Sequence, residues 1–116
     1  MTYEEMEKLA RTGDVLTEAI GFRLRAARQS IRPKVSQKEM AERMGQVNTT
    51  YATWETGKAY PQIYALRYFY LNHRIDFNFL LYDSFSQLPG DVKDALFEAM
   101  QALALKPRCR SNSRAT

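Results

Sequence analysis

Residues 36–61 read SQKEMAERMGQVNTTYATWETGKAYP, and this stretch decides the fold. The run Ser36-Gln37-Lys38-Glu39 is typical of a capping box, in which the Ser and Glu side chains satisfy each other's backbone amides at the start of a helix. That helix is expected to end at Gly45, where a positive φ is easiest without a Cβ. A second short helix should then run to about Gly57, and Ala41 is small enough for the two helices to cross closely.

Helical spacing of apolar residues continues on both sides of this stretch, whereas no segment alternates apolar with polar residues for more than a few positions. After Pro61, a helix is expected to turn Leu66, Phe69 and Tyr70 inward. The fold class predicted is all-α, with five core helices and one helical appendage at each end. Outside the central pair, the expected helices cover about residues 3–12, 20–32, 61–70, 77–81 and 89–105.

The composition excludes several classes of protein. The chain has 116 residues, 45% hydrophobic and 26% charged, which suits one compact domain. One Cys (Cys109) and one His (His73) leave no disulfide framework, no metal site and no Ser-His-Asp set. We therefore expect no catalytic residue and no cofactor. No apolar run is long enough to cross a membrane and the N-terminus is acidic, so a cytoplasmic protein with no membrane partner is expected.

Charge is distributed unevenly along the chain. Residues 20–82 hold ten basic and four acidic residues, whereas residues 1–19 and 83–105 are each net acidic, and residues 106–116 carry four basic residues. A basic centre of this kind favours a polyanion as partner, although many basic surfaces are only solvated.

The segment from Ile20 to Phe69 resembles the phage-repressor (Xre/Cro-type) helix-turn-helix DNA-binding family. No single position is specific to that family, but the set occurs here in register, and the resemblance covers residues 18–82. The matching positions are Ile20, Arg28, Ser36-Gln37, Met40-Ala41, Met44-Gly45, Trp54-Glu55, Gly57 and Pro61.

This resemblance implies a five-helix repressor-like DNA-binding domain whose recognition helix follows Gly45 and lies in the major groove of double-stranded DNA. It also implies an ion pair between Arg28 and Glu55 that ties the first helix of the domain to the recognition helix. Val47 replaces the usual Ser or Thr cap of the recognition helix, so Asn48 is a candidate cap. The implied base contacts are Asn48, Thr49, Ala52 and Thr53. The implied phosphate contacts are Gln37, Thr50, Lys58, Arg32 and Lys34.

Four segments follow from these observations. Residues 1–17 form an N-terminal helical extension, 18–82 the helix-turn-helix domain, 83–105 a C-terminal helix, and 106–116 a disordered basic tail. An apolar stripe on the C-terminal helix is expected to pair two copies of the chain, because Phe97 and Leu105 extend it beyond what one contact with the core needs. The stripe consists of Val92, Leu96, Ala99, Met100 and Leu103.

The function expected is that of a transcriptional regulator, a repressor, which binds a near-palindromic operator as a homodimer. One alternative is an antitoxin-like autoregulator that binds a protein partner through a terminal helix. Another is an interaction or assembly module with a degenerate helix-turn-helix, and RNA binding stays open on charge alone. The polar run Asn48-Thr49-Thr50 and the basic centre favour DNA reading over the assembly module.

Overall fold

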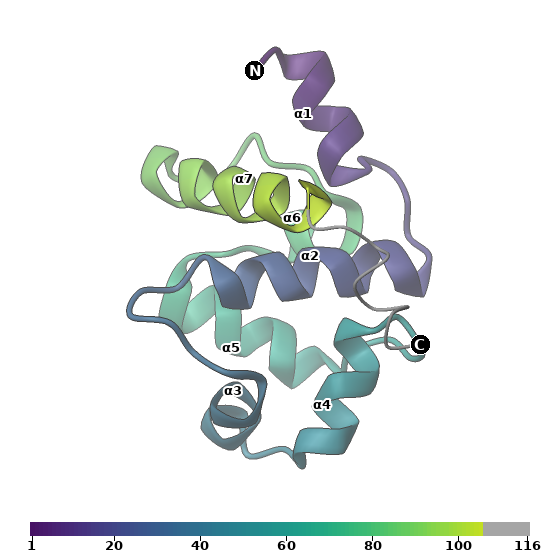
Figure 1. Cartoon of the computed structure of the whole chain (residues 1–116), viewed down its shortest axis with the longest axis vertical. Helices are drawn as coiled ribbons and strands as arrows, with labels where there is room; N and C mark the ends of the chain where they lie inside the picture. Colours follow the sequence, from purple (N-terminus) through teal and green to yellow (C-terminus); the bar gives the residue numbers. More distant parts are fainter. Residues whose placement is uncertain (106–116) are drawn as a thin grey trace.

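Seven α-helices and no strand make up residues 1–105, the part of the chain that the computed structural model describes (Figure 1). The predicted all-α class is confirmed for these residues. The expected basic tail, residues 106–116 with Cys109, lies outside the described part. The helices are α1 (Tyr3–Ala10), α2 (Thr17–Gln29), α3 (Gln37–Met44), α4 (Asn48–Glu55), α5 (Ile63–His73), α6 (Phe77–Tyr82) and α7 (Gly90–Leu105).

Helix α2 runs through the middle of the fold, with α7 on one side and α4 and α5 on the other (Figure 1). Alanine and glycine supply much of its buried surface, so its neighbours approach closely. A Cβ at Gly21 would lie 2.7 Å from the carbonyl oxygen of Trp54 and 2.8 Å from that of Glu55. Any side chain at residue 21 would therefore push the end of α4 away from α2.

The fully buried Arg23 of α2 joins the segment after α1 to α6. Its Nε donates to the carbonyl of Ala10 at 3.0 Å, and Nη2 donates to the carbonyls of Arg11 and Asp14, each at 2.6 Å. A fourth, longer bond runs from Nη1 to the carbonyl of Leu80 at 3.4 Å. Hydrogen bonds to four carbonyls compensate the guanidinium for its loss of water. The N-terminal extension is thereby fixed to the rest of the fold.

Asp83, which ends α6, is also fully buried. Its Oδ2 accepts a hydrogen bond from the Thr12 hydroxyl at 2.7 Å, and the Gly13 amide donates to the carbonyl of Tyr82 at 2.8 Å. The other carboxyl oxygen, Oδ1, is buried and has no hydrogen-bond partner among residues 1–105. These contacts link the segment between α1 and α2 to the end of α6.

Helix α7 packs on α1 and α2 within the same chain. Leu96 is fully buried, and the ring of Phe97 meets that of Phe85 edge-on at a centroid distance of 5.0 Å. Four residues of the stripe expected to pair two copies are buried within the chain and Leu103 is half-buried, so the stripe leaves little free surface for such a contact. Leu105 is exposed, but at the helix end it is separate from the stripe. The buried residues of α7 are Val92, Leu96, Phe97, Ala99 and Met100.

Helix α5 differs from expectation at its start and on its inner face. It begins at Ile63, two residues after the buried Pro61. Leu66 and Phe69 are buried as expected, together with Ala65. Tyr70, expected to face inward, is 53% exposed. Ala65, Leu66 and Phe69 already fill the core-facing side of this helix, and Tyr70 instead packs edge-on against the half-buried Phe77 at 6.1 Å.

Candidate nucleic-acid interface

Helices α3 and α4 are joined by a tight turn at Gly45, which has a φ of 76°. This left-handed residue closes α3, because its amide and that of Gln46 both donate back into the last turn, Gln46 to the carbonyl of Ala41 at 2.8 Å. Ala41 is buried between the two helices, which pack against each other. The two short helices predicted on either side of Gly45 are therefore present, and the turn between them has the positive φ that glycine permits.

Helix α4 presents polar side chains on the side that faces away from the core. Asn48 and Thr49 are exposed, and Ala52 and Thr53 are half-buried one turn further on. The opposite side is anchored by the buried Trp54 and its neighbours. The Thr53 hydroxyl donates to the carbonyl of Thr50 at 2.7 Å, a local bond that leaves its methyl group and oxygen lone pairs available. The structure thus brings the four residues implied as base contacts onto one surface.

The start of α4 corrects one expectation. Asn48 does not cap the helix: Val47 occupies the N-cap position without a side-chain hydrogen bond, and Asn48 is the first helical residue. The Val47 amide donates to the side-chain oxygen of Gln46 at 2.6 Å, and the Gln46 amide group donates to the Tyr64 hydroxyl. Gln46 therefore supplies the polar contact at this helix start, which leaves the side chain of Asn48 outside the cap.

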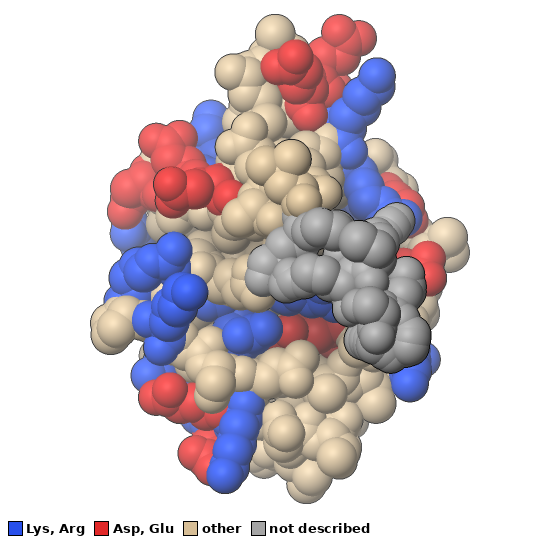
Figure 2. Space-filling view, in the orientation of Figure 1, with Lys and Arg blue, Asp and Glu red and all other residues tan. Residues whose placement is uncertain are grey.

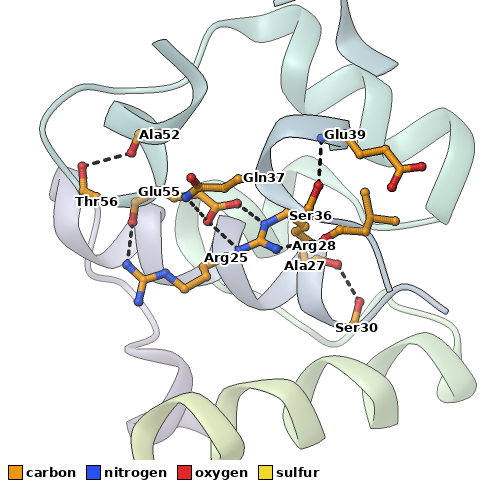
Figure 3. A network of polar contacts seen from close by, with 11 residues as sticks. Arg25, Ala27, Arg28, Ser30, Ser36, Gln37, Glu39, Ala52, Glu55 and Thr56 are labelled. Carbon is orange, nitrogen blue, oxygen red and sulfur yellow. Dashed lines mark hydrogen bonds and ion pairs between the residues drawn. The ribbon is translucent and has the colours of Figure 1, made fainter. Parts of the chain in front are cut away.

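Arg28 and Glu55 lie together at the centre of a polar network that joins α2, α3 and α4 (Figure 3). Arg28 Nε donates to Glu55 Oε2 at 2.7 Å, and Nη2 donates to Oε1 at 3.1 Å, which makes the pair bidentate. The Arg28 side chain is 13% exposed and that of Glu55 is fully buried. Burial alone lowers the pKa of Arg28, but the hydrogen bonds and charge of Glu55 outweigh it and the net pKa is raised. Arg28 therefore stays charged, and its bidentate contact with Glu55 links α2 to the end of α4.

Gln37, implied as a phosphate contact, is part of this network. Its side-chain amide donates to Glu55 Oε1 at 3.0 Å, and the residue is half-buried. What remains available to an anion near Gln37 is the N-terminus of α3, where backbone amides and the helix dipole attract negative charge. A phosphate contact through the side-chain amide would require the bond to Glu55 to break.

Only half of the expected capping box forms at α3. The Ser36 hydroxyl accepts from the Glu39 amide at 3.1 Å. The Glu39 carboxylate does not return to Ser36; it pairs with Arg43 at 3.0 Å, one turn along the helix. The i,i+4 ion pair competes for the same carboxylate, and here it prevails.

The other implied phosphate contacts lie around the two helices. Lys58 is exposed just beyond α4, and Arg32 and Lys34 are exposed in the loop between α2 and α3, whereas Thr50 is half-buried. Arg32 Nη1 donates to the carbonyls of Gln29 at 2.6 Å and Ile31 at 3.0 Å. Figure 2 shows Lys and Arg side chains gathered on the side of the molecule where this loop lies. The structure thus places cations on the loop before α3 and on the segment after α4.

Two residues of the network escaped the sequence analysis. Arg25 Nη2 donates to the carbonyl of Glu55 at 3.3 Å, and the Thr56 hydroxyl donates to the carbonyl of Ala52 at 3.0 Å (Figure 3). Arg25 precedes Arg28 by three residues, which places both on one face of a helix. A contact of Arg25 near Glu55 could therefore have been predicted from the sequence. Thr56 follows the helix, and nothing in the sequence predicted its contact.

Within residues 1–105, no cluster of His, Cys, Asp or Glu is arranged to hold a metal ion. In the same range, none of the helices has the length and apolar character needed to span a bilayer. In comparisons with family models, curated proteins and solved structures, nothing matches this chain.

Proposed function

We propose that the protein is a sequence-specific DNA-binding transcriptional regulator that acts as a repressor in the cytoplasm. In this proposal α2–α6 form a five-helix repressor-like unit, α4 enters the major groove of double-stranded DNA, and no catalytic step is involved. The observation that carries the proposal is the pair α3 and α4. Its turn is fixed by Gly45, its outer surface is polar, and its inner end is held by the bidentate pair of Arg28 and Glu55.

Base reading is proposed for the surface of α4. Asn48 is suited to adenine, because its amide N–H can donate to N7 while its amide oxygen accepts from the N6 amino group. Thr49 offers a hydroxyl and a methyl group to thymine. Neither side chain is needed inside the fold, because both are exposed. Phosphate contacts are proposed for Lys58, Arg32, Lys34, Thr50 and the N-terminus of α3 at Gln37, which would set the register without reading sequence.

The experiment is a selection from random double-stranded DNA, followed by binding measurements with variants. Thr49→Ala should change the preferred base at one or two positions per half-site by about 1–3 kcal/mol, because a groove contact is lost. Lys58→Gln should weaken binding to all DNA sequences alike. It should also make the slope of log affinity against log salt concentration shallower by about one unit.

Matched controls remove the same groups elsewhere. Ser86→Ala removes an exposed hydroxyl between α6 and α7, and Lys8→Gln removes an exposed cation on α1. Neither should alter base preference or salt slope. A selection that returns no motif would overturn sequence-specific binding and favour the interaction module, and enrichment of a protein partner at the terminal helices would favour the antitoxin-like alternative.

We further propose that two copies pair through α5. The apolar stripe of α7 is buried, so α5 exposes more apolar surface than α7 does. On α5, Ile63 is 65% exposed, Tyr70 53% and Leu71 67%. Their spacing of seven and eight residues places them on one side of the helix. Since α5 follows α4 after a short connection, a two-fold contact there would hold two recognition helices at a fixed separation. An operator with half-sites one DNA turn apart requires that separation to be roughly 34 Å.

Light scattering at micromolar concentration, with and without DNA that carries two half-sites, tests this pairing. Leu71→Glu should give a monomer that binds one half-site, because a carboxylate would be buried in the contact. Leu105→Glu places the same charge on the exposed end of α7 and should leave the dimer intact. A dimer that survives Leu71→Glu, or a wild-type protein that stays monomeric on two half-sites, would overturn pairing through α5.

A further inference from the structure

A cavity of about 580 Å³ lies between the end of α2, the loop before α3, the first turn of α3 and residues 98–102 of α7. Its size falls within the range of about 300–1,000 Å³ found for small-molecule sites. The walls combine apolar groups, among them Val35, Ala99 and Ala102, with several charged side chains. The cavity thus has the composition of a ligand site, with an apolar lining and a few polar groups.

Some of the charged side chains around the cavity have polar partners within the described residues, and others have none. Arg28 is held by Glu55 and the Val35 carbonyl, and Glu39 is held by Arg43. Lys34 has no hydrogen bond or ion pair to any residue in 1–105. Arg32 bonds only carbonyl oxygens, through Nη1, so its Nε and Nη2 have no acceptor in that range.

Besides Glu39, a second acidic side chain, Glu98 of α7, lines the cavity, and it makes no ion pair within the described residues. Figure 2 shows acidic side chains over α7 directly above basic ones over the neighbouring loop. The loop side also carries the N-terminus of α3, whose first amides add positive potential. An anionic group is therefore favoured on the side of Lys34 and Arg32 and disfavoured beside Glu98.

We propose that this cavity binds a small organic carboxylate. Its carboxylate would lie against Lys34 and Arg32, and its apolar body would lie against Val35, Ala99 and Ala102. The chain's own residues 106–116 are not a complementary occupant, because they carry four basic residues and no acidic one. A carboxylate would neutralise the loop cations, whereas that segment would add to their charge.

Binding there would have a regulatory consequence that rests on the proposed function. Arg32 and Lys34 are also proposed to contact DNA phosphates, so a carboxylate in the cavity would compete with the DNA backbone for the same cations. The loop leads directly into Ser36 and α3, which places the ligand beside the proposed DNA-reading pair of helices. The carboxylate is thereby expected to release DNA.

The first test uses the full chain without DNA, and its readout is amide chemical shifts in NMR spectra during titration with sodium benzoate. Benzoate carries one carboxylate on an apolar ring; benzamide has the same ring without the charge, and inorganic phosphate has charge without the ring. Benzoate should shift the amides of residues 28–39 and 98–102 in a saturable manner, and benzamide and phosphate should bind at least about tenfold more weakly. Shifts spread over the surface, or equal responses to benzoate and benzamide, would overturn the proposal.

Three variants sharpen the result. Lys34→Met should weaken benzoate binding about tenfold through loss of a charged hydrogen bond, whereas Glu98→Gln should strengthen it or leave it unchanged. Ala102→Trp should block the cavity without changing any charge, and residue 102 is exposed, so the fold should tolerate it. Lys8→Met, which removes a distant exposed cation, is the control and should bind benzoate like the wild type. Equal loss on Lys34→Met and Glu98→Gln would overturn the carboxylate assignment, because removing a negative charge from the site should not weaken the binding of an anion.

The regulatory step is measured separately by displacement of a selected DNA site with benzoate. Localised benzoate binding in a protein that binds no DNA would refute the proposed function while leaving the carboxylate site in place. DNA binding without localised benzoate shifts would refute the carboxylate site and leave the proposed function in place.

Discussion

Glu55 has no exposed side-chain surface, yet its two carboxylate oxygens accept hydrogen bonds from Arg28 on α2 and Gln37 on α3. A buried carboxylate with these partners is tolerable, and the same carboxylate without them is strongly destabilising. The position of α4 against α2 therefore depends on both members of the ion pair being present. The position of α4 also depends on Gly21, because only a residue without a side chain lets the carbonyls at the end of α4 approach α2 this closely.

We predict that Arg28→Met or Glu55→Gln alone lowers the free energy of unfolding by about 3–5 kcal/mol, because each leaves its partner buried and uncompensated. The double variant should lose clearly less than the sum of the two, which chemical denaturation of all four proteins measures. Arg43 and Glu39 form an exposed i,i+4 pair on α3, and the same cycle there should show little coupling. Additive losses at Arg28 and Glu55 would contradict the inferred interaction.

Gly45 permits a sharp test of the turn. Its φ of 76° is strained for any residue with a Cβ, although a Cβ there would meet no atom within 4 Å. Gly45→Ala should therefore destabilise the protein through backbone strain alone, by about 1–2 kcal/mol in thermal or chemical unfolding. Gly90→Ala is the matched control, since Gly90 also has open space around its Cβ position but no positive φ. A loss at Gly45 no greater than at Gly90 would contradict the role assigned to the turn.

At the scale of elements, α7 decides how the C-terminal part of the chain behaves. The sequence shows an apolar stripe on this helix but not what covers it, because the same spacing serves a core-facing helix and a dimer contact equally well. The structure resolves the ambiguity through packing on α1 and α2. Phe97, which made the apolar face look too wide for one contact, packs against Phe85.

Leu96→Ala should consequently destabilise the monomer by about 2–5 kcal/mol, because it leaves a cavity in the core. Leu105→Ala makes the same chemical change at a residue that is 82% exposed, and should alter stability by less than about 0.5 kcal/mol. Urea unfolding curves distinguish the two. If Leu96→Ala instead left unfolding unchanged and reduced only self-association, α7 would have the dimer role first expected for it.

At the scale of the whole molecule, residues far apart in sequence meet at Asp83. Burial raises the pKa of this carboxyl to about 7, and the Thr12 hydroxyl and the charge of Arg23 oppose the increase only in part. In the unfolded chain the carboxyl releases its proton near pH 3.8. Between these two values the folded state binds more protons than the unfolded state.

We therefore predict that the contribution of Asp83 to stability is fully present below about pH 3.8 and is lost as the pH rises through about 7. Asp83→Asn should remove this pH-dependent contribution, because asparagine keeps the shape and tolerates the left-handed backbone at this position. Thermal melts at pH 4.5 to 8 measure the difference. Asp94→Asn, at an exposed aspartate on α7, is the control and should follow the wild-type profile.

Much of the central architecture is predictable from residues with strong local preferences. Gly45, Ala41 and the apolar spacing predict two crossing helices, and Arg28 and Glu55 were paired in advance only through a family resemblance. The half-formed capping box at Ser36 was not predictable, because Glu39 has a second partner one turn away. The buried positions of Arg23 and Asp83 were also missed, since a charged residue carries no sign in sequence that carbonyls from distant segments surround it.

The hydrogen bonds of Arg23 affect the order in which parts of the protein unfold. A chain terminus usually frays residue by residue, since each hydrogen bond lost is replaced at once by one to water. Here a single guanidinium serves carbonyls of residues 10, 11, 14 and 80, so loosening residues 10–14 would strand a cation in the interior. Residues 10–14 are therefore expected to detach only together with the core, and hydrogen exchange should show the amides of this segment opening together with those of α2.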